Sequence, residues 1–172
     1  SLTELNLSKN RLGAKSSQVI AAAVRASSSL VRINLDGSAL PLLNLNGVAE
    51  VSAIDLSKKS LGIMSGVVMA SLISDNGALT ELDVRSSGIC AEGSMHLSSA
   101  VLASASLIRF SKIPIKELRA NETNSLLMVD MGLGDTEGRV LAALIRDNTS
   151  LTDLDLRASN IGGESAEQLA AA

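Results

Sequence analysis

Two hydrophobic patterns alternate along this chain of 172 residues. In short stretches, of which 5–7 is the first, aliphatic and polar residues alternate, so that the aliphatic side chains lie on one side of an extended strand. Longer stretches carry aliphatic residues three and four positions apart, as at Ile20, Ala23 and Val24, which is the spacing of one face of an α-helix. The chain is therefore predicted to alternate between short strands and helices.

The two patterns recur as a unit. Leu2 and Leu30, and again Leu79 and Leu107, open successive units 28 residues apart. The pattern L-x-x-L-x-L-x-x-x-x-L-G, with other aliphatic residues at some leucine positions, begins at Leu2, Val51, Leu79 and Leu151. Strands are predicted around Leu5, Ile33, Ile54, Leu82, Phe110, Val129 and Leu154. Helices are predicted after the first, third, fourth, sixth and seventh of these strands.

Two units depart from the pattern. Residues 29–47 and 106–121 each contain a strand followed by a proline, Pro41 or Pro114, and leave no room for a helix. Each is followed by two long units, which gives a higher-order repeat of short, long and long units. We expect these two short units to be helix-less and to close with an extended or tightly turned connection.

One unit cannot bury its apolar faces alone, so the units must stack, strand beside parallel strand and helix beside helix. Helices are about 10 Å wide and strands about 4.8 Å apart, so the stack must curve with its strands on the inside. The predicted fold is therefore an α/β solenoid of about seven repeats that forms one domain over 1–172. Because the chain opens at Ser1 and stops in QLAAA, we expect it to be an excerpt of a longer protein.

The unit resembles a known family. A 28-residue unit of the form LxxLxLxxNxLG followed by a helix is similar to the ribonuclease-inhibitor-like class of leucine-rich repeats. Related repeats occur in Ran GTPase-activating proteins and in intracellular nucleotide-binding immune receptors. The resemblance implies the curved solenoid, with strands on the concave face and helices on the convex face. The family's loop asparagine is matched only at Asn10, and other units have Ser38, Lys59, Ser87 or Ser159 there.

Composition limits the chemistry. Phe110 is the only aromatic residue, which suits a core of small repeated layers. His96 and Cys90 are the only histidine and cysteine, so we predict no catalytic, cofactor or metal site and read both as structural, His96 partly buried and Cys90 small and buried. A net charge of −3 without a basic patch argues against nucleic acid, and no apolar stretch is long enough to span a membrane. A single cysteine suits an intracellular location, in the cytoplasm or inside an organelle.

The candidate binding residues lie between the strand leucines, where alternation directs them to the concave surface. Aspartates form a row at Asp55, Asp83, Asp130 and Asp155. The other candidates beside this row are Glu4, Asn6, Arg32, Asn34, Glu81, Arg85, Asp153 and Arg157. Either these are simply solvated strand positions, or the acidic row selects a basic protein partner while the arginines set its register.

Three functions are compatible with this pattern. The first is a protein-interaction scaffold that uses the concave face. The second is a structural subunit held within a larger assembly through its helices or ends. The third is a Ran-type GTPase activator, although only the repeat itself supports it. The first hypothesis makes the protein a binding module and not an enzyme, with a protein partner.

Two places are shorter than the pattern requires. Aligned with the unit at Ser29, four residues are missing after Phe110. Aligned on the aspartate row, about three residues are missing after Met131. Either natural deletions have shortened these two units, or the protein has residues at both places that this sequence lacks.

Overall fold

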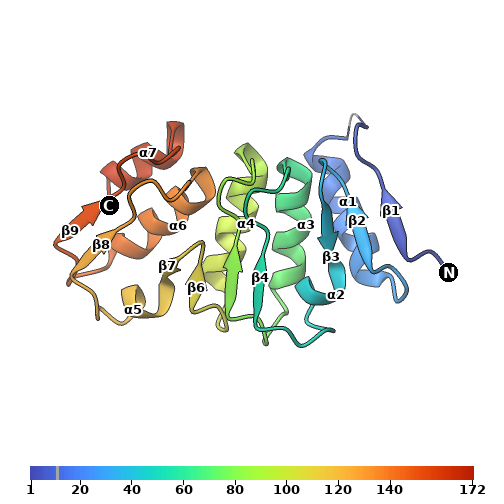
Figure 1. Ribbon diagram of the computed structural model, residues 1–172, viewed down its shortest axis with the longest axis horizontal. Coiled ribbons are helices and arrows are strands. Elements are labelled where there is room, and N and C mark those ends of the chain that lie inside the picture. The colour runs from blue at the N-terminus through green and yellow to red at the C-terminus, as the bar shows by residue number, and fades with distance from the viewer. Residues whose placement is uncertain (11) are drawn as a thin grey trace.

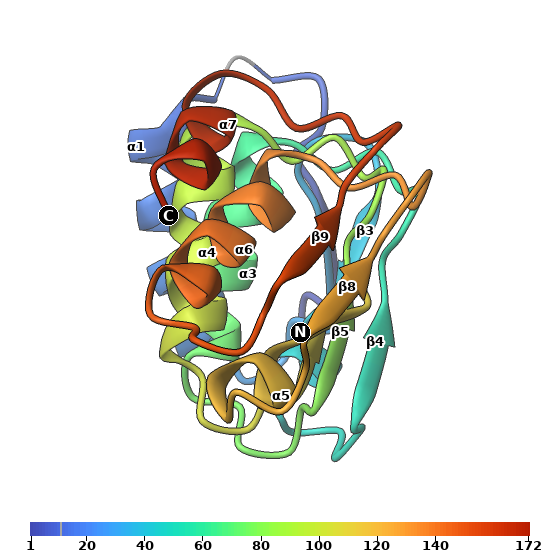
Figure 2. The ribbon, with the colours of Figure 1, turned by 90° about the vertical axis from the view of Figure 1, so that its left-hand side faces the viewer.

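The computed structural model of the protein describes residues 1–10 and 12–172. Its strands lie in one layer and its longer helices in another, as the end-on view shows (Figure 2). The units follow one another along the longest axis in chain order, from the N-terminus to the C-terminus (Figure 1). The mixed α/β architecture with alternating strands and helices is confirmed.

The long units each pair a three-residue strand with a helix of two or more turns. Their strands are β1 (Glu4–Asn6), β4 (Ala53–Asp55), β5 (Glu81–Asp83), β8 (Ser125–Leu127) and β9 (Asp153–Asp155). Their helices are α1 (Ala14–Ala26), α3 (Ile63–Ile73), α4 (Ala91–Ala103), α6 (Asp135–Arg146) and α7 (Gly163–Ala170). These helices form a continuous layer, because α1 packs on α3, α3 on α4, α4 on α6 and α6 on α7.

The two short units are hairpins that lead into a single helical turn. The second unit contains β2 (Arg32–Asn34), β3 (Ala39–Pro41) and α2 (Leu42–Leu45); the fifth contains β6 (Arg109–Phe110), β7 (Ile113–Pro114) and α5 (Ile115–Arg119). The expectation that these units are helix-less is therefore wrong, although neither helix reaches two turns. Each proline stands directly before its helix, where the backbone N–H that proline lacks is not needed.

The strands form three sheets, in the orders β1-β2-β3, β4-β5-β6-β7 and β8-β9. Strands of consecutive units pair in parallel, with Leu5 opposite Ile33 and Ile54 opposite Leu82. However, β2 pairs with β3, and β6 with β7, in antiparallel fashion. The prediction of seven parallel strands is wrong in this respect. In each short unit the returning strand takes the sheet edge to which the next unit's strand would otherwise add.

The sixth strand is centred on Leu126 and not on Val129. Leu126 lies opposite Leu154, which preserves the 28-residue spacing between parallel neighbours. In this register Leu133 and Gly134 align with Leu61 and Gly62, so no residue is missing after Met131. The strand was expected around Val129 because Asp130 was assigned to the aspartate row, and that assignment was wrong.

The shortening after Phe110 is accommodated by a tight turn. Phe110 pairs with Ile113 across Ser111 and Lys112, whereas Ile33 in the second unit pairs with Leu40 across six residues. Both turn residues have positive φ, 49° at Ser111 and 70° at Lys112, as a two-residue type I′ hairpin requires. Lys112 is exposed at the tip of this turn and does not occupy a core position.

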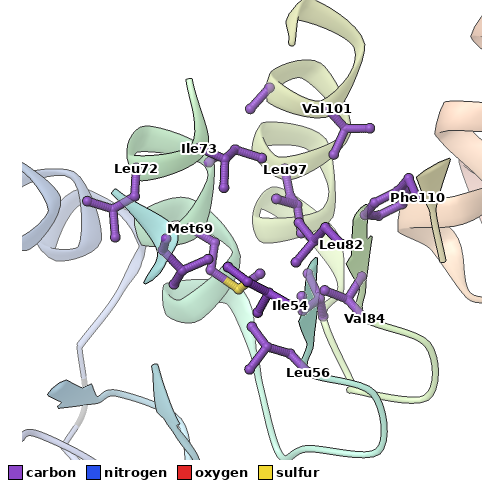
Figure 3. Close-up of a cluster of buried hydrophobic side chains, with 14 of the residues drawn as sticks. Ile54, Leu56, Met69, Leu72, Ile73, Leu82, Val84, Leu97, Val101 and Phe110 are labelled. Carbon is purple, nitrogen blue, oxygen red and sulfur yellow. The ribbon is translucent and has the colours of Figure 1, made fainter. Parts of the chain in front are cut away.

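The core fills the space between the two layers, where side chains of β4, β5 and β6 meet those of α3 and α4 (Figure 3). Phe110 is fully buried there. The alternating pattern directs Leu7, Leu56, Val84 and Leu156 to the inward side of their strands, and we expect them to be buried. Leu56 and Val84 are buried, whereas Leu7 and Leu156 are only half-buried. They belong to the first and last units, which have a neighbouring unit on one side only.

Candidate functional site

The outward side chains of the strands and of the turns that follow them form one surface, which we call the strand face. Eleven of the twelve predicted candidates lie on it, and each is exposed or half-buried: Glu4, Asn6, Arg32, Asn34, Asp55, Glu81, Asp83, Arg85, Asp153, Asp155 and Arg157. The aspartate row is present at three strands, with Asp55 directly opposite Asp83 in the sheet. The predicted alternation of buried and outward residues is present in β4 and β5, whereas Leu154 and Asp155 of β9 are both half-buried.

The aspartates of this row have a structural task. Each accepts a hydrogen bond from the backbone N–H two residues later: Asp55 from Ser57 at 2.8 Å, and Asp83 and Asp155 from Arg85 and Arg157 at 3.1 Å. A carboxylate at this position therefore closes the turn that ends the strand. Asn6 accepts from the N–H of Ser8 in the same way at 3.0 Å, which explains why asparagine occurs in the row as well.

Two of the aspartates also hold an arginine in a two-point ion pair. Arg85 donates from Nε to Oδ1 of Asp83 at 3.0 Å and from Nη2 to Oδ2 at 2.7 Å. Arg157 and Asp155 repeat this geometry at 3.0 and 2.7 Å. Such parallel bonds fix the guanidinium plane on the strand face.

The pKa values follow from these contacts. Hydrogen bonds from Arg157 lower the pKa of Asp155, and hydrogen bonds from Ser57 lower the pKa of Asp55. The hydrogen bonds to Asp83 raise the pKa of the Arg85 guanidinium. The carboxylates of Asp55 and Asp155 thus stay ionised well into the acidic range, and the two ion pairs largely cancel the negative charge that the sequence alone predicted for this row.

Asp130 does not belong to the aspartate row, so its predicted place in that row was wrong. It lies in the turn after β8 with φ of 55°, a place that Lys58 occupies in the third unit with φ of 56°. The row position of the sixth unit is occupied by Leu127, opposite Asp155. The 28-residue spacing from Leu126 to Leu154 is the sequence signal that could have shown this.

The register of the sixth unit exposes three large apolar side chains, which we call the apolar stripe. Leu127, Val129 and Met131 are 60%, 41% and 36% exposed and alternate along the chain. Other long units have charged or small polar residues at these places, such as Asp83 and Arg85 at the first two. The stripe was missed in the sequence because it depends on the correct register.

A hollow of about 330 Å³ adjoins the stripe. It is lined by residues of the third, fourth and sixth units, among them Ser57, Arg85 and Met131. The strand face therefore combines fixed charges, an apolar stripe and a depression within one region.

The remaining candidates form weaker contacts. Glu81 lies 3.6 Å from Nε of Arg109 on the neighbouring strand, and Ser125 donates a hydrogen bond to Asp153 at 3.1 Å. Glu4 and Arg32 are exposed in register with each other on β1 and β2. Pairs at this level of exposure contribute little to stability, which leaves their charges accessible to a partner.

Glu137 is a buried acid that the sequence placed only in the first turn of a helix. It is 3% exposed, and its Oε1 accepts a hydrogen bond from the hydroxyl of Ser111 at 2.7 Å. Its Oε2 accepts from the backbone N–H of Gly134 at 2.9 Å, which caps α6. Burial raises the pKa of this carboxyl despite the two hydrogen bonds.

The residues with catalytic or metal-binding potential are separated. His96 is half-buried on α4, as expected, with its Nε2 3.8 Å from Glu92. Cys90 is exposed, so its reading as a buried residue was wrong. Across residues 1–10 and 12–172, the histidine, cysteine and acidic side chains form no group of three that could hold a metal ion. Within the same part of the chain, no helix has the length and apolar character needed to cross a membrane.

Comparison with known families supports the repeat at both ends of the chain. The family model of the leucine-rich repeat matches residues 1–21 and 147–170, which correspond to the first and last units. A comparison with curated proteins finds no match to this sequence. These two segments are thus similar to leucine-rich repeats, a motif that commonly mediates protein–protein interaction and is typically not enzymatic.

Proposed function

We propose that this protein is a curved leucine-rich-repeat solenoid of the ribonuclease-inhibitor-like kind and serves as a scaffold that binds a protein partner through its strand face. Stacked repeats expose one long surface, which is the usual binding surface of such arrays. The proposed contact residues are the eleven charged and polar candidates on the strand face, joined by the apolar stripe.

The apolar stripe is the observation that carries this proposal. Exposed apolar groups that lie together mark interaction sites more reliably than single exposed leucines do. Burial of one leucine side chain under a partner stabilises a complex by about 1.5–3 kcal/mol before the costs of association. The fixed arginines of the Asp83–Arg85 and Asp155–Arg157 pairs would surround this contact and orient the partner.

Two expectations from the sequence remain predictions. A basic partner is favoured by Asp55, whose lowered pKa keeps its exposed carboxylate charged. Membership of a larger complex is favoured by a separate observation on the helix layer, where Val19 of α1 and Met95 of α4 are 71% and 46% exposed. The second hypothesis, a structural subunit of an assembly, would use this surface.

A pair of matched variants tests the proposal. Partners are captured from a lysate with the wild-type chain and identified by mass spectrometry, and the affinity of each is then measured with purified protein. Leu127→Asp should weaken binding about tenfold or more, because a carboxylate would be placed in the apolar contact. Val19→Asp is the control, since it adds the same charge at an equally exposed site on the helix layer.

The two outcomes discriminate between the hypotheses. Binding that survives Val19→Asp and is lost in Leu127→Asp supports the strand face. Binding that is lost only in Val19→Asp contradicts the proposal and favours assembly through the helices.

A further inference from the structure

The short hairpin of the fifth unit leaves a cleft between its neighbours. The cleft has a volume of about 380 Å³ and lies between the 84–90 loop of the fourth unit and residues 132–137 of the sixth, which include the first turn of α6; Asn160 of the seventh unit also lines it. No described residue of the fifth unit lines it. The two segments are joined directly, because the backbone N–H of Ser86 donates to the carbonyl of Gly132 at 3.0 Å. The cleft therefore lies between two segments that a backbone hydrogen bond holds together.

The second unit shows what a longer hairpin does at the corresponding place. Its turn contains Asp36, whose Oδ2 accepts hydrogen bonds from the N–H groups of Gly62 at 3.0 Å and Ser65 at 2.7 Å. The same turn offers the hydroxyl of Ser38 to the N–H of Ser60 at 3.1 Å. The longer turn thus contacts the third unit through Asp36 and Ser38. The fifth unit has no counterpart of Asp36, and an open cleft lies at the corresponding place.

The charged groups of the cleft are all acidic among the described residues that line it: Asp135 and Glu137. Glu137 is the buried one, and no lysine or arginine of the lining balances it. The nearest charges outside the lining include Asp83 and Arg85, and this arginine already forms an ion pair with Asp83. A buried carboxylate without a cationic partner is costly, so this site has a large electrostatic gain available from a cation.

The remaining lining suits a cation with an organic stem. Thr136 is 2% exposed, lines the cleft and has a hydroxyl without a hydrogen-bond partner among the described residues. Val84, Ile89 and Leu133 supply apolar wall. Alkyl stems with a charged head match such a mixture of apolar and acidic surface.

We propose that this cleft binds an organic cation, a guanidinium or alkylammonium group, with the Glu137 carboxylate as its counter-charge and the Thr136 hydroxyl as a second hydrogen-bond acceptor. The cation is either the side chain of an arginine or lysine in a partner or the head of a free amine. Both sources share the same recognition chemistry.

An NMR titration of the full chain tests this assignment. Methylguanidinium chloride is added at constant ionic strength, and the amide signals of Gly132, Gly134 and Thr136 are followed together with the Glu137 side-chain carboxyl signal. We expect saturable shifts confined to the two segments. Tetramethylammonium, which has no N–H donor, should bind about tenfold or more weakly, since it cannot form the charged hydrogen bonds.

Two variants decide the origin of any shift. Glu137→Gln keeps an oxygen for the N–H of Gly134 but removes the charge, and it should weaken methylguanidinium binding about tenfold or more. Inserting Asn-Leu-Asp-Gly between Phe110 and Ser111 gives the fifth unit the turn length of the second unit and should abolish binding by filling the cleft. If that insertion unfolds the protein, Glu137→Gln alone decides.

The source of the cation is distinguished by comparing methylguanidinium with the peptide acetyl-Gly-Arg-Gly-amide. Tighter binding of the peptide indicates a partner's side chain, and binding of methylguanidinium alone indicates a free amine; either result supports the cleft as a cation site. The proposal is overturned if no saturable shift occurs, or if Glu137→Gln binds as tightly as the wild type.

Discussion

The two hairpin units differ in the residue that caps the helix of the following unit. In the second unit, a four-residue loop carries Asp36 to the start of α3, where its carboxylate accepts two backbone N–H groups. In the fifth unit only Ser111 and Lys112 separate the paired residues Phe110 and Ile113, and the start of α6 is capped by Glu137 of the same helix. Because Glu137 stands where α3 has Ser65, the loss of a distant carboxylate coincides with the gain of a local one.

The comparison shows that the length of one turn determines the burial of a residue in the next unit. Glu137 reaches back beneath the tight turn and receives the hydroxyl of Ser111, which is itself 1% exposed. Asp36 by contrast is exposed in its longer loop. The longer turn thus carries an exposed helix cap, Asp36. Beside the shorter turn the cap, Glu137, is buried together with Ser111.

The largest effect should come from the residue at the base of the shorter hairpin. Phe110→Ala should lower the free energy of unfolding by about 3–5 kcal/mol, because a fully buried aromatic ring would leave a cavity. The equivalent substitution in the other hairpin, Ile33→Ala, removes fewer atoms and should cost less. Urea denaturation of both variants measures this difference. A cost for Phe110→Ala below that of Ile33→Ala would contradict the expectation that the larger cavity has the larger cost.

The two helix caps, Glu137 and Asp36, should contribute differently to the free energy of unfolding. Glu137→Ala should cost about 1–3 kcal/mol, because it leaves the buried Ser111 hydroxyl and the Gly134 N–H without their partner. Asp36→Ala should cost about 0.5–2 kcal/mol, the usual range for loss of a helix N-cap. Thermal unfolding followed by circular dichroism would compare them, and equal losses would show that burial of the cap has no energetic consequence.

The buried cap should also respond to pH. Burial raises the pKa of Glu137 above the ordinary value of 4.5, so the folded state holds its proton more tightly than the unfolded state does. Relative to Glu137→Gln, the wild type should be most stable below that ordinary value and lose stability as pH rises from it through the raised folded pKa. Unfolding free energies of both proteins across this range give the difference. A wild type that gains stability over the range, relative to Glu137→Gln, would contradict the raised pKa.

The smallest effects should come from the turns themselves, and with opposite signs. Lys112→Gly should raise stability by about 0.5–1 kcal/mol, since it relieves a left-handed backbone in a non-glycine residue. Gly37→Ala in the other loop should lower stability, because Gly37 has φ of 147° and a new Cβ would meet Cβ of Ser60 at 3.1 Å. Differential scanning calorimetry resolves both. The same sign for the two changes would show that the turns do not differ as described.

Much of the fold could be predicted from spacing. The 28-residue period located the strands at Leu5 and Ile33 and those at Ile54, Leu82 and Phe110, which are parallel neighbours in register. The strand at Leu154 was located by its match to the repeated pattern. The period failed for the sixth strand, where Asp130 resembled the aspartates of other units and displaced the register. The antiparallel strands β3 and β7 were missed because two or three residues before a proline carry no periodicity that marks a strand.

The site was predictable in position and less so in chemistry. Alternation placed Asp83 and Arg85 on one surface, but their ion pair depends on how the turn brings residues two apart together. The burial of Glu137 could not be read from its own helix, because the neighbouring hairpin creates it. The apolar stripe at Leu127 was hidden by the register error alone.

The division of the strands into three separate sheets has a mechanical consequence. The helix layer continues across the ends of the sheets at β3 and β7, whereas the strand layer is interrupted there. A force applied to the two ends of the chain would therefore be resisted at these two borders by helix packing and by hydrogen bonds such as those of Asp36 and Glu137, without pairing between strands. We expect the molecule to extend in steps that begin at the borders, which an optical trap would register as separate unfolding events. A single cooperative rupture would show that the helix layer holds the three blocks as one.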